Sequence, residues 1–152
     1  MLQTVEGIVK EIWNHQKIMA SRIGLRYINL YNTDLAEKKV TRQMFASKIR
    51  ALMTPSLIDT GNELVPVRNM VTSEYQKNDI KIIYRAGLYN QFYPMPISKE
   101  DYVIDIDCFS ISAIDSAGEI MDFLNDAHES IQFLFEGSIT DKMREEMKKS
   151  NE

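Results

Sequence analysis

The sequence predicts an α+β domain of two layers, in which a mainly antiparallel sheet of about four strands is packed by helices on one face. Three strand-like segments follow one another between residues 64 and 112 with short connections, which is typical of an antiparallel meander rather than of parallel strands joined by helices. Segments with apolar residues at helical spacing precede and follow these strands, so the helices are expected to cover one face of the sheet.

The first part of the chain is predicted to form a helix followed by a strand. Apolar residues between positions 5 and 13 recur at helical spacing and indicate an amphipathic helix that ends before Ser21. Residues 22–32 then alternate as a strand does, with an apolar side and a side that carries Arg26. This strand is the expected fourth member of the sheet.

A second helix is predicted to start at Thr41 and to stop before Pro55, because the residue before a proline disfavours helical geometry. Its expected buried stripe is Phe45, Ile49 and Leu52. Pro66 indicates either an edge strand or the start of a strand. Lys77, Asn78 and Asp79 are expected to turn the chain tightly into the following strand.

The loop at residues 90–101 contains several aromatic and apolar residues. We expect Phe92, Tyr93 and Met95 to anchor this loop to the core, because apolar loop residues usually pack inward; a recognition loop is the alternative. The strand at residues 101–112 shows the clearest alternation, with Cys108 on its apolar side.

Two helices are predicted to complete the chain. Ser116 and Glu119 have the spacing of a capping box. The apolar stripe of the long helix that follows is Ile120, Leu124, Ala127, Ile131 and Leu134. Thr140 is expected to cap a short last helix, and residues 148–152 to form a frayed tail.

Composition indicates a single domain over residues 1–152. Of these residues 44% are apolar and 26% are charged, which excludes the disordered and low-complexity classes. A single cysteine, Cys108, predicts no internal disulfide, and the sequence shows neither a secretory signal nor an apolar run long enough for a membrane span. We therefore expect a cytoplasmic protein that does not bind a membrane.

Charge is unevenly distributed along the chain. Residues 1–50 carry nine basic and four acidic side chains, whereas the remainder carries nine basic and eighteen acidic ones. The basic residues are scattered rather than clustered, and the net charge is −4. These features disfavour a nucleic-acid partner and favour mutual pairing of the two halves.

Candidate chemistry centres on Asp105 and Asp107, which project from the same face of one strand roughly 7 Å apart. One interpretation is a carboxylate pair for metal binding or acid–base catalysis. The other, which we favour, is cross-strand pairing with Arg26, Lys81 and Arg85, which alternation places on the same face if the strands adjoin.

Other chemical signals are weak. His128 could serve as a general base, but a histidine beside an apolar stripe is more often a hydrogen-bonded boundary residue. Cys108 is expected to be inert on its apolar face. The six glycines are isolated and a single cysteine cannot give zinc spacing, so we expect neither a metal nor a cofactor.

Three segments resemble the C-terminal half of a sporadically distributed, uncharacterised family of prokaryotic proteins. They are RIGLRYINLYN at 22–32, VIDIDCF at 103–109 and FLNDAHESIQFLFEGSITDKMREEM at 123–147. The first is similar to a family strand that reads RLGLRYIN, and the last to a helix that runs into an FE..IT...RE pattern. The resemblance implies no activity and no catalytic residues. It implies a further α+β half before this one, so the chain is expected to be a fragment, the second half of a larger architecture.

The function expected from these observations is a non-enzymatic interaction or assembly module, which pairs as a homo-oligomer or with the missing N-terminal half. The alternative is a small-molecule or metal-dependent ligand-binding or hydrolytic domain that uses the charged face of the sheet. The candidate residues of this face are Arg26, Lys81, Arg85, Asp105, Asp107 and His128. A ligand site requires these groups to converge in a concave pocket, whereas a module requires them to be spread over a flat face.

Overall fold

The computed structural model describes residues 2–15, 19–31, 42–52, 65–99 and 101–149. Within them the chain forms, in order, α1 (Leu2–His15), β1 (Gly24–Tyr31), the 3-10 turn η1 (Arg42–Met44), α2 (Ser47–Leu52), β2 (Asn69–Lys77), β3 (Ile80–Tyr89), β4 (Asp101–Ser110), α3 (Ala117–Ser138) and α4 (Asp141–Lys149). The predicted start of the second helix at Thr41 lies outside the described residues. So do residues 150–152 of the tail predicted at 148–152, whereas Lys148 and Lys149 belong to α4.

The four strands form one sheet in the order β1-β4-β3-β2, and each neighbouring pair is antiparallel. The predicted meander of three strands and the α+β class are confirmed. The strand after Pro66 is an edge strand, which is one of the two predicted alternatives. The β2–β3 hairpin turns through Asn78 and Asp79, and Asn78 takes the left-handed backbone conformation (φ 53°) that asparagine tolerates better than most residues.

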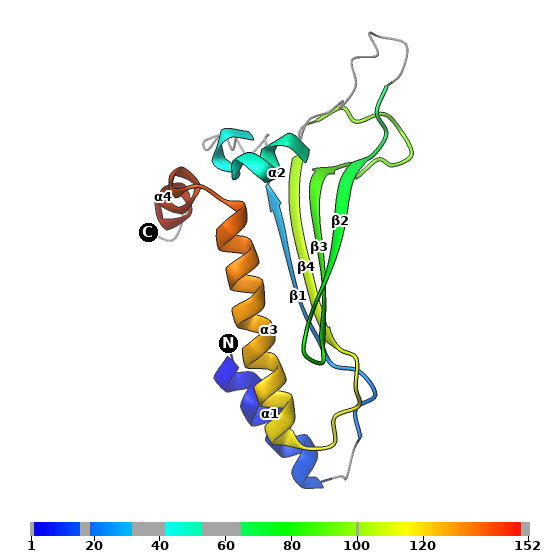
Figure 1. Cartoon of the computed structure of the whole chain (residues 1–152), viewed down its shortest axis with the longest axis vertical. Helices are drawn as coiled ribbons and strands as arrows, with labels where there is room; N and C mark the ends of the chain where they lie inside the picture. The colour runs from blue at the N-terminus through cyan, green and yellow to red at the C-terminus, as the bar shows by residue number, and fades with distance from the viewer. Residues whose placement is uncertain (1, 16–18, 32–41, 53–64, 100, 150–152) are drawn as a thin grey trace.

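The helices lie on one side of the sheet (Figure 1). α3 runs along the strands and contacts β4 and β1, while α1 packs against α3. The Oγ of Ser116 accepts the backbone N–H of Glu119 at 3.2 Å, which confirms Ser116 as the N-cap of the predicted capping box. The core between the layers consists of alternate strand residues and the inner stripe of α3, among them Ile82, Tyr84, Ile104, Ile106, Cys108, Ile120, Leu124, Ala127 and Ile131.

The predicted single helix around Phe45 is wrong, because the chain divides into η1 and α2 there. Phe45 is fully buried and forms an isolated bridge with Ile139. The N–H of Ala46 donates to the carbonyl of Ser138 at 2.8 Å. This backbone pairing to a distant segment replaces the helical hydrogen bonds. A tertiary contact therefore overrides the helix propensity of the local sequence at this point.

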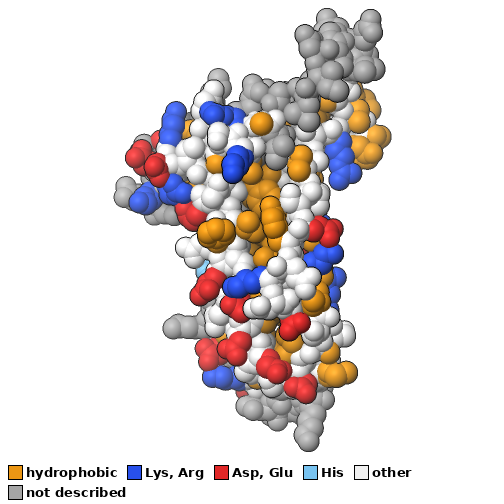
Figure 2. Space-filling model, in the orientation of Figure 1, with side chains coloured by type: hydrophobic (Ala, Val, Ile, Leu, Met, Phe, Trp, Pro, Cys, Tyr) orange, Lys and Arg blue, Asp and Glu red, His pale blue; other side chains and the backbone are white. Residues whose placement is uncertain are grey.

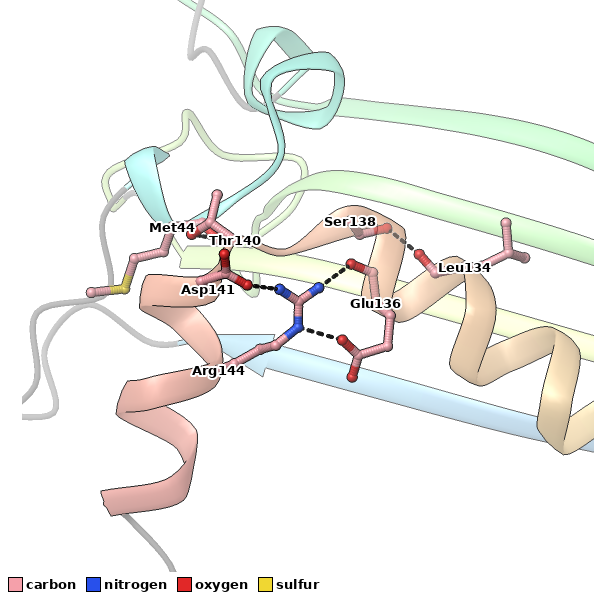
Figure 3. A network of polar contacts seen from close by, with 7 residues as sticks. All are labelled: Met44, Leu134, Glu136, Ser138, Thr140, Asp141 and Arg144. Atoms are coloured by element: carbon pink, nitrogen blue, oxygen red, sulfur yellow. Dashed lines mark hydrogen bonds and ion pairs between the residues drawn. The ribbon is translucent and has the colours of Figure 1, made fainter.

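The end of α3 is fixed at the same junction (Figure 3). Thr140 immediately precedes α4. Its hydroxyl donates to the carbonyl of Met44 at 3.0 Å, so the side chain also joins the start of α4 to η1. Arg144 of α4 donates to the backbone carbonyl of Glu136 at 2.8 Å and also pairs with the carboxylates of Glu136 and Asp141. These contacts hold η1, the end of α3 and the start of α4 together.

The prediction that the loop after β3 anchors its aromatic residues in the core is also wrong. Phe92, Tyr93 and Met95 are each more than half exposed. Asn90 organises the loop instead: its Oδ1 accepts the N–H of Phe92 at 3.0 Å, and its Nδ2 donates to the carbonyls of Val67 and Met95. A polar side chain therefore satisfies the loop backbone, and the loop needs no apolar anchor from these three residues.

Candidate functional site

Five of the six candidate residues lie on the face of the sheet that is opposite the helices. Arg26 belongs to β1, Lys81 and Arg85 to β3, and Asp105 and Asp107 to β4. The strand register pairs Arg26 with Asp107 and Arg85 with Asp105. Because side chains alternate along a strand, these positions share one face, as the sequence predicts.

Asp105 is the centre of this cluster. Arg26 donates from Nε to Oδ1 at 2.8 Å and from Nη2 to Oδ2 at 2.7 Å, and Arg85 donates from Nη1 to Oδ2 at 3.0 Å. Only 5% of Asp105 is exposed. A buried carboxylate with two guanidinium partners is the arrangement in which a charge of this kind is stable, so the predicted cross-strand pairing is present for Asp105.

The environment of Asp105 fixes its ionised form. Burial alone would raise its pKa, but the hydrogen bonds and positive charges of Arg26 and Arg85 outweigh burial and hold the pKa below its ordinary value of 3.8. The pKa of Arg26 is raised in turn, chiefly by its hydrogen bond to Asp105. A general base requires a proton affinity near the working pH and an accessible oxygen, and Asp105 has the opposite properties.

The other charged residues of the face do not add to the Asp105 cluster as a ligand set. The ammonium group of Lys81 pairs with Glu74 of β2 at 2.7 Å. Asp107 is half-buried and acts on Arg26 through its charge. Among the residues that the structure describes, no three histidine, cysteine, aspartate or glutamate side chains are grouped so as to hold a metal ion. Apart from the Asp105 cluster, the charges of this face are thus spread along the strands.

His128 lies on the other side of the sheet, on α3. Its Nδ1 is 3.3 Å from the hydroxyl of Tyr27, and the two rings meet edge to face with centroids 6.0 Å apart. Tyr27 points toward the helices, so His128 is separated from Asp105 by the sheet itself. The structure therefore does not bring His128 to the charged face, and it has the hydrogen-bonded boundary position that the sequence favours.

Cys108 is fully buried on the helix side of β4, and burial raises the pKa of its thiol to about 11. A thiol with this pKa is protonated at neutral pH and is a poor nucleophile. The expectation that Cys108 is inert is consistent with this environment.

Sequence reasoning missed the apolar part of the open face. Ile28 and Leu30 of β1 are 59% and 48% exposed on the same side as Arg26, and Tyr89 of β3 is also exposed there. The signal was present in residues 22–32, where β1 has apolar residues on both of its faces instead of on one. A strand of this kind indicates that both faces of a sheet meet other surfaces.

The fold and the site define an α+β domain with an open, mixed-charge sheet face. Comparisons with protein-family models, with curated proteins and with solved structures give no significant match. In the described part of the chain, no helix is long and apolar enough to cross a membrane.

Proposed function

We propose that this chain is a non-enzymatic interaction module, and that its open sheet face binds the same face of a second copy. The observation that carries the proposal is the exposure of Ile28 and Leu30 beside the Asp105 cluster. All helices that contact the sheet in the described residues lie on its other side. An apolar patch with a polar surround, on a face that no described helix covers, is characteristic of a protein–protein interface.

The charge pattern favours a second copy as the partner. The face carries Arg26, Lys81 and Arg85 together with Glu74, Asp105 and Asp107. The two signs are interspersed, so the face can be complementary to itself across a two-fold axis. A nucleic acid, in contrast, requires an excess of positive charge.

The area of the face determines how strongly the two copies are expected to associate. Four strands of eight to ten residues span roughly 600 Å² at the usual strand spacing and rise, and this is an upper bound because Asp101 and Val103 on this face are already buried. Two such faces would bury at most about 1,200 Å², which is the lower end for specific interfaces. We therefore expect an equilibrium between monomer and dimer that depends on concentration. The expected compartment is the cytoplasm, where a single cysteine such as Cys108 is normally reduced. The sequence resemblance supports another α+β half as the alternative partner.

Sedimentation velocity over a wide range of protein concentration tests this proposal. We expect the wild-type chain to shift from monomer to dimer, and the double variant Ile28→Glu/Leu30→Glu to remain monomeric. Ile111→Glu is the matched control, because Ile111 is 49% exposed but lies in the loop after β4. A strict monomer at every concentration, or a dimer that the double variant leaves intact, would refute the proposal.

Native mass spectrometry of the same samples tests the ligand-binding alternative. We expect masses of the chain and its dimer without adducts. A reproducible metal or small-molecule adduct that Asp107→Asn removes would overturn the module and establish a ligand site on this face.

A further inference from the structure

On the helix side of the sheet, too, the described helices leave part of the surface uncovered. A helix is about 10 Å wide, whereas the outer strands of a four-stranded sheet lie roughly 14 Å apart, so one helix covers about two strands. α3 lies over β4 and β1, and α2 contacts β3 and β2 at one end only. The helix-side residues of β3 are buried in the core, so the part that no described helix covers is chiefly the edge strand β2, where Tyr75 is exposed.

This uncovered part forms a groove along α3. Two cavities of about 570 and 310 Å³ share Tyr75, Phe133 and Leu134 in their walls, and Ile82 and Tyr84 contribute the strand side. Figure 2 shows hydrophobic side chains along the middle of the molecule, where the groove lies. A cavity of this size with mainly apolar walls is suitable for side chains of a partner.

Two aromatic residues stand at the edges of the groove. Phe133 of α3 is 79% exposed, and Tyr75 of β2 is 48% exposed. They rise from opposite walls, one from the helix and one from the edge strand. Exposed aromatic residues next to an apolar cavity are the residue type and position that dominate binding energy at protein interfaces.

The wall formed by α3 is acidic. α3 contains five aspartate and glutamate residues and neither lysine nor arginine. Glu129 and Lys77 of β2 both line the larger cavity, and Lys77 is paired with Asp126 of α3 at 3.4 Å. A third cavity of about 270 Å³ continues past this pair and is bounded by Asp79, Glu119 and Asp122. The groove thus runs into an acidic region near the start of α3, where acidic side chains gather in Figure 2.

We propose that this groove binds a basic amphipathic helix of a partner protein. The apolar stripe of such a helix would lie between Phe133 and Tyr75, over a cavity floor formed by Leu134 and the buried Ile82, in the manner of other helix-in-groove complexes. Its lysine or arginine residues would face Glu129 and the acidic region at the start of α3, where charge complementarity sets orientation and association rate. The helix would complete the layer that α3 leaves half formed.

Fluorescence anisotropy with designed peptides tests the proposal. The probe is a labelled peptide of about 18 residues, a length that matches the roughly 30 Å of β2, with leucine at helical spacing and lysine on the other face. One comparison peptide carries glutamate in place of lysine, and another has the same composition in scrambled order. We expect the basic amphipathic peptide to bind at least tenfold more tightly than either.

Variants of the chain locate the site. We expect Phe133→Ala to weaken peptide binding at least fivefold and Glu129→Lys to weaken it most at low salt. Phe92→Ala is the matched control, since Phe92 is an exposed aromatic residue in the loop after β3, and it should leave binding unchanged. Phe133 is so exposed that its substitution should not disturb the fold, which circular dichroism verifies.

The possible results distinguish this proposal from the proposed dimerisation through the open sheet face. Equal binding of the scrambled peptide, no binding at all, or unchanged affinity of Phe133→Ala overturns the groove as the docking site. If Phe133→Ala instead converts a wild-type dimer into a monomer, the occupant is a second copy and the partner helix is refuted. Ile28→Glu/Leu30→Glu should bind the basic peptide as the wild type does, because those residues are on the opposite face.

Discussion

Arg26 forms a bidentate pair with Asp105 diagonally across two strands, although the residue directly opposite Arg26 in the strand register is Asp107. Arg85, which is directly opposite Asp105, donates a third hydrogen bond to the same carboxylate. One acid therefore joins the edge strand β1 to β3 through β4. The two aspartates, which look equivalent in the sequence, have different roles in the structure.

We predict that Asp105→Asn lowers the free energy of unfolding by about 2 to 3 kcal/mol, because it leaves two guanidinium groups without their shared charge. Asp107→Asn should change it by less than about 1 kcal/mol, since Asp107 interacts with Arg26 by charge and not by a hydrogen bond that the structure records. Urea unfolding followed by circular dichroism measures both values. Equal losses for the two variants would contradict the central role of Asp105.

The same pair predicts a dependence of stability on pH. The pKa of Asp105 is lower in the folded chain than its ordinary value of 3.8, so its contribution is fully present above that value and is lost as the pH falls through the folded pKa. The difference in stability between the wild type and Asp105→Asn should therefore be constant from pH 7 to about pH 5 and should shrink at lower pH. A difference that grows on acidification would be inconsistent with a lowered pKa.

Much of the fold could be predicted from local signals. The alternation along β4 and the hairpin at Asn78 were sufficient to predict the meander, and the shared face of Arg26, Arg85 and Asp105 followed from the same period of two. The N-cap at Ser116 is predictable from the sequence because it depends on two residues that are three positions apart. In each of these cases the determining interactions are close in sequence or follow from strand geometry.

Other features depend on contacts that no local pattern contains. Phe45 interrupts a helical pattern because its neighbour pairs with Ser138, more than ninety residues away. Phe92 is exposed because Asn90 satisfies the loop backbone. The groove beside Phe133 arises from the lateral position of α3 on the sheet, which is a property of packing rather than of spacing.

The hydroxyl groups of two tyrosines differ in their partners, so the same substitution should change stability in opposite directions at the two positions. The hydroxyl of Tyr31 is buried and has no hydrogen-bond partner among the described residues, whereas that of Tyr84 is 2.9 Å from the Oγ of Ser138. Tyr31→Phe removes a polar group that burial leaves unsatisfied, so we expect the free energy of unfolding to rise by about 1 kcal/mol. Tyr84→Phe should lower it by about 1 kcal/mol, because Ser138 then loses this partner. Thermal unfolding of the two variants in parallel tests the prediction, and a loss of stability in Tyr31→Phe would indicate a partner for its hydroxyl.

Gly87 of β3 should be intolerant of any side chain. A Cβ at this position would lie 2.2 Å from the carbonyl oxygen of Asn69 and 2.7 Å from the Cα of Met70. Both are backbone atoms of the edge strand β2, which cannot rotate away as a side chain can. We expect Gly87→Ala to lower the free energy of unfolding by about 1 to 3 kcal/mol. Gly7→Ala gives the opposite expectation, a gain of about 0.5 to 1 kcal/mol, because Gly7 lies in α1 with nothing within 4 Å of the added methyl group.

Hydrogen exchange distinguishes a local from a global effect of Gly87→Ala. If β2 alone is displaced, the amides of Asn69–Lys77 and their β3 partners lose protection while those of β1 and β4 keep it. Since β2 forms one wall of the groove beside Phe133, this variant should also weaken binding of the basic peptide, whereas Gly7→Ala should leave that binding unchanged.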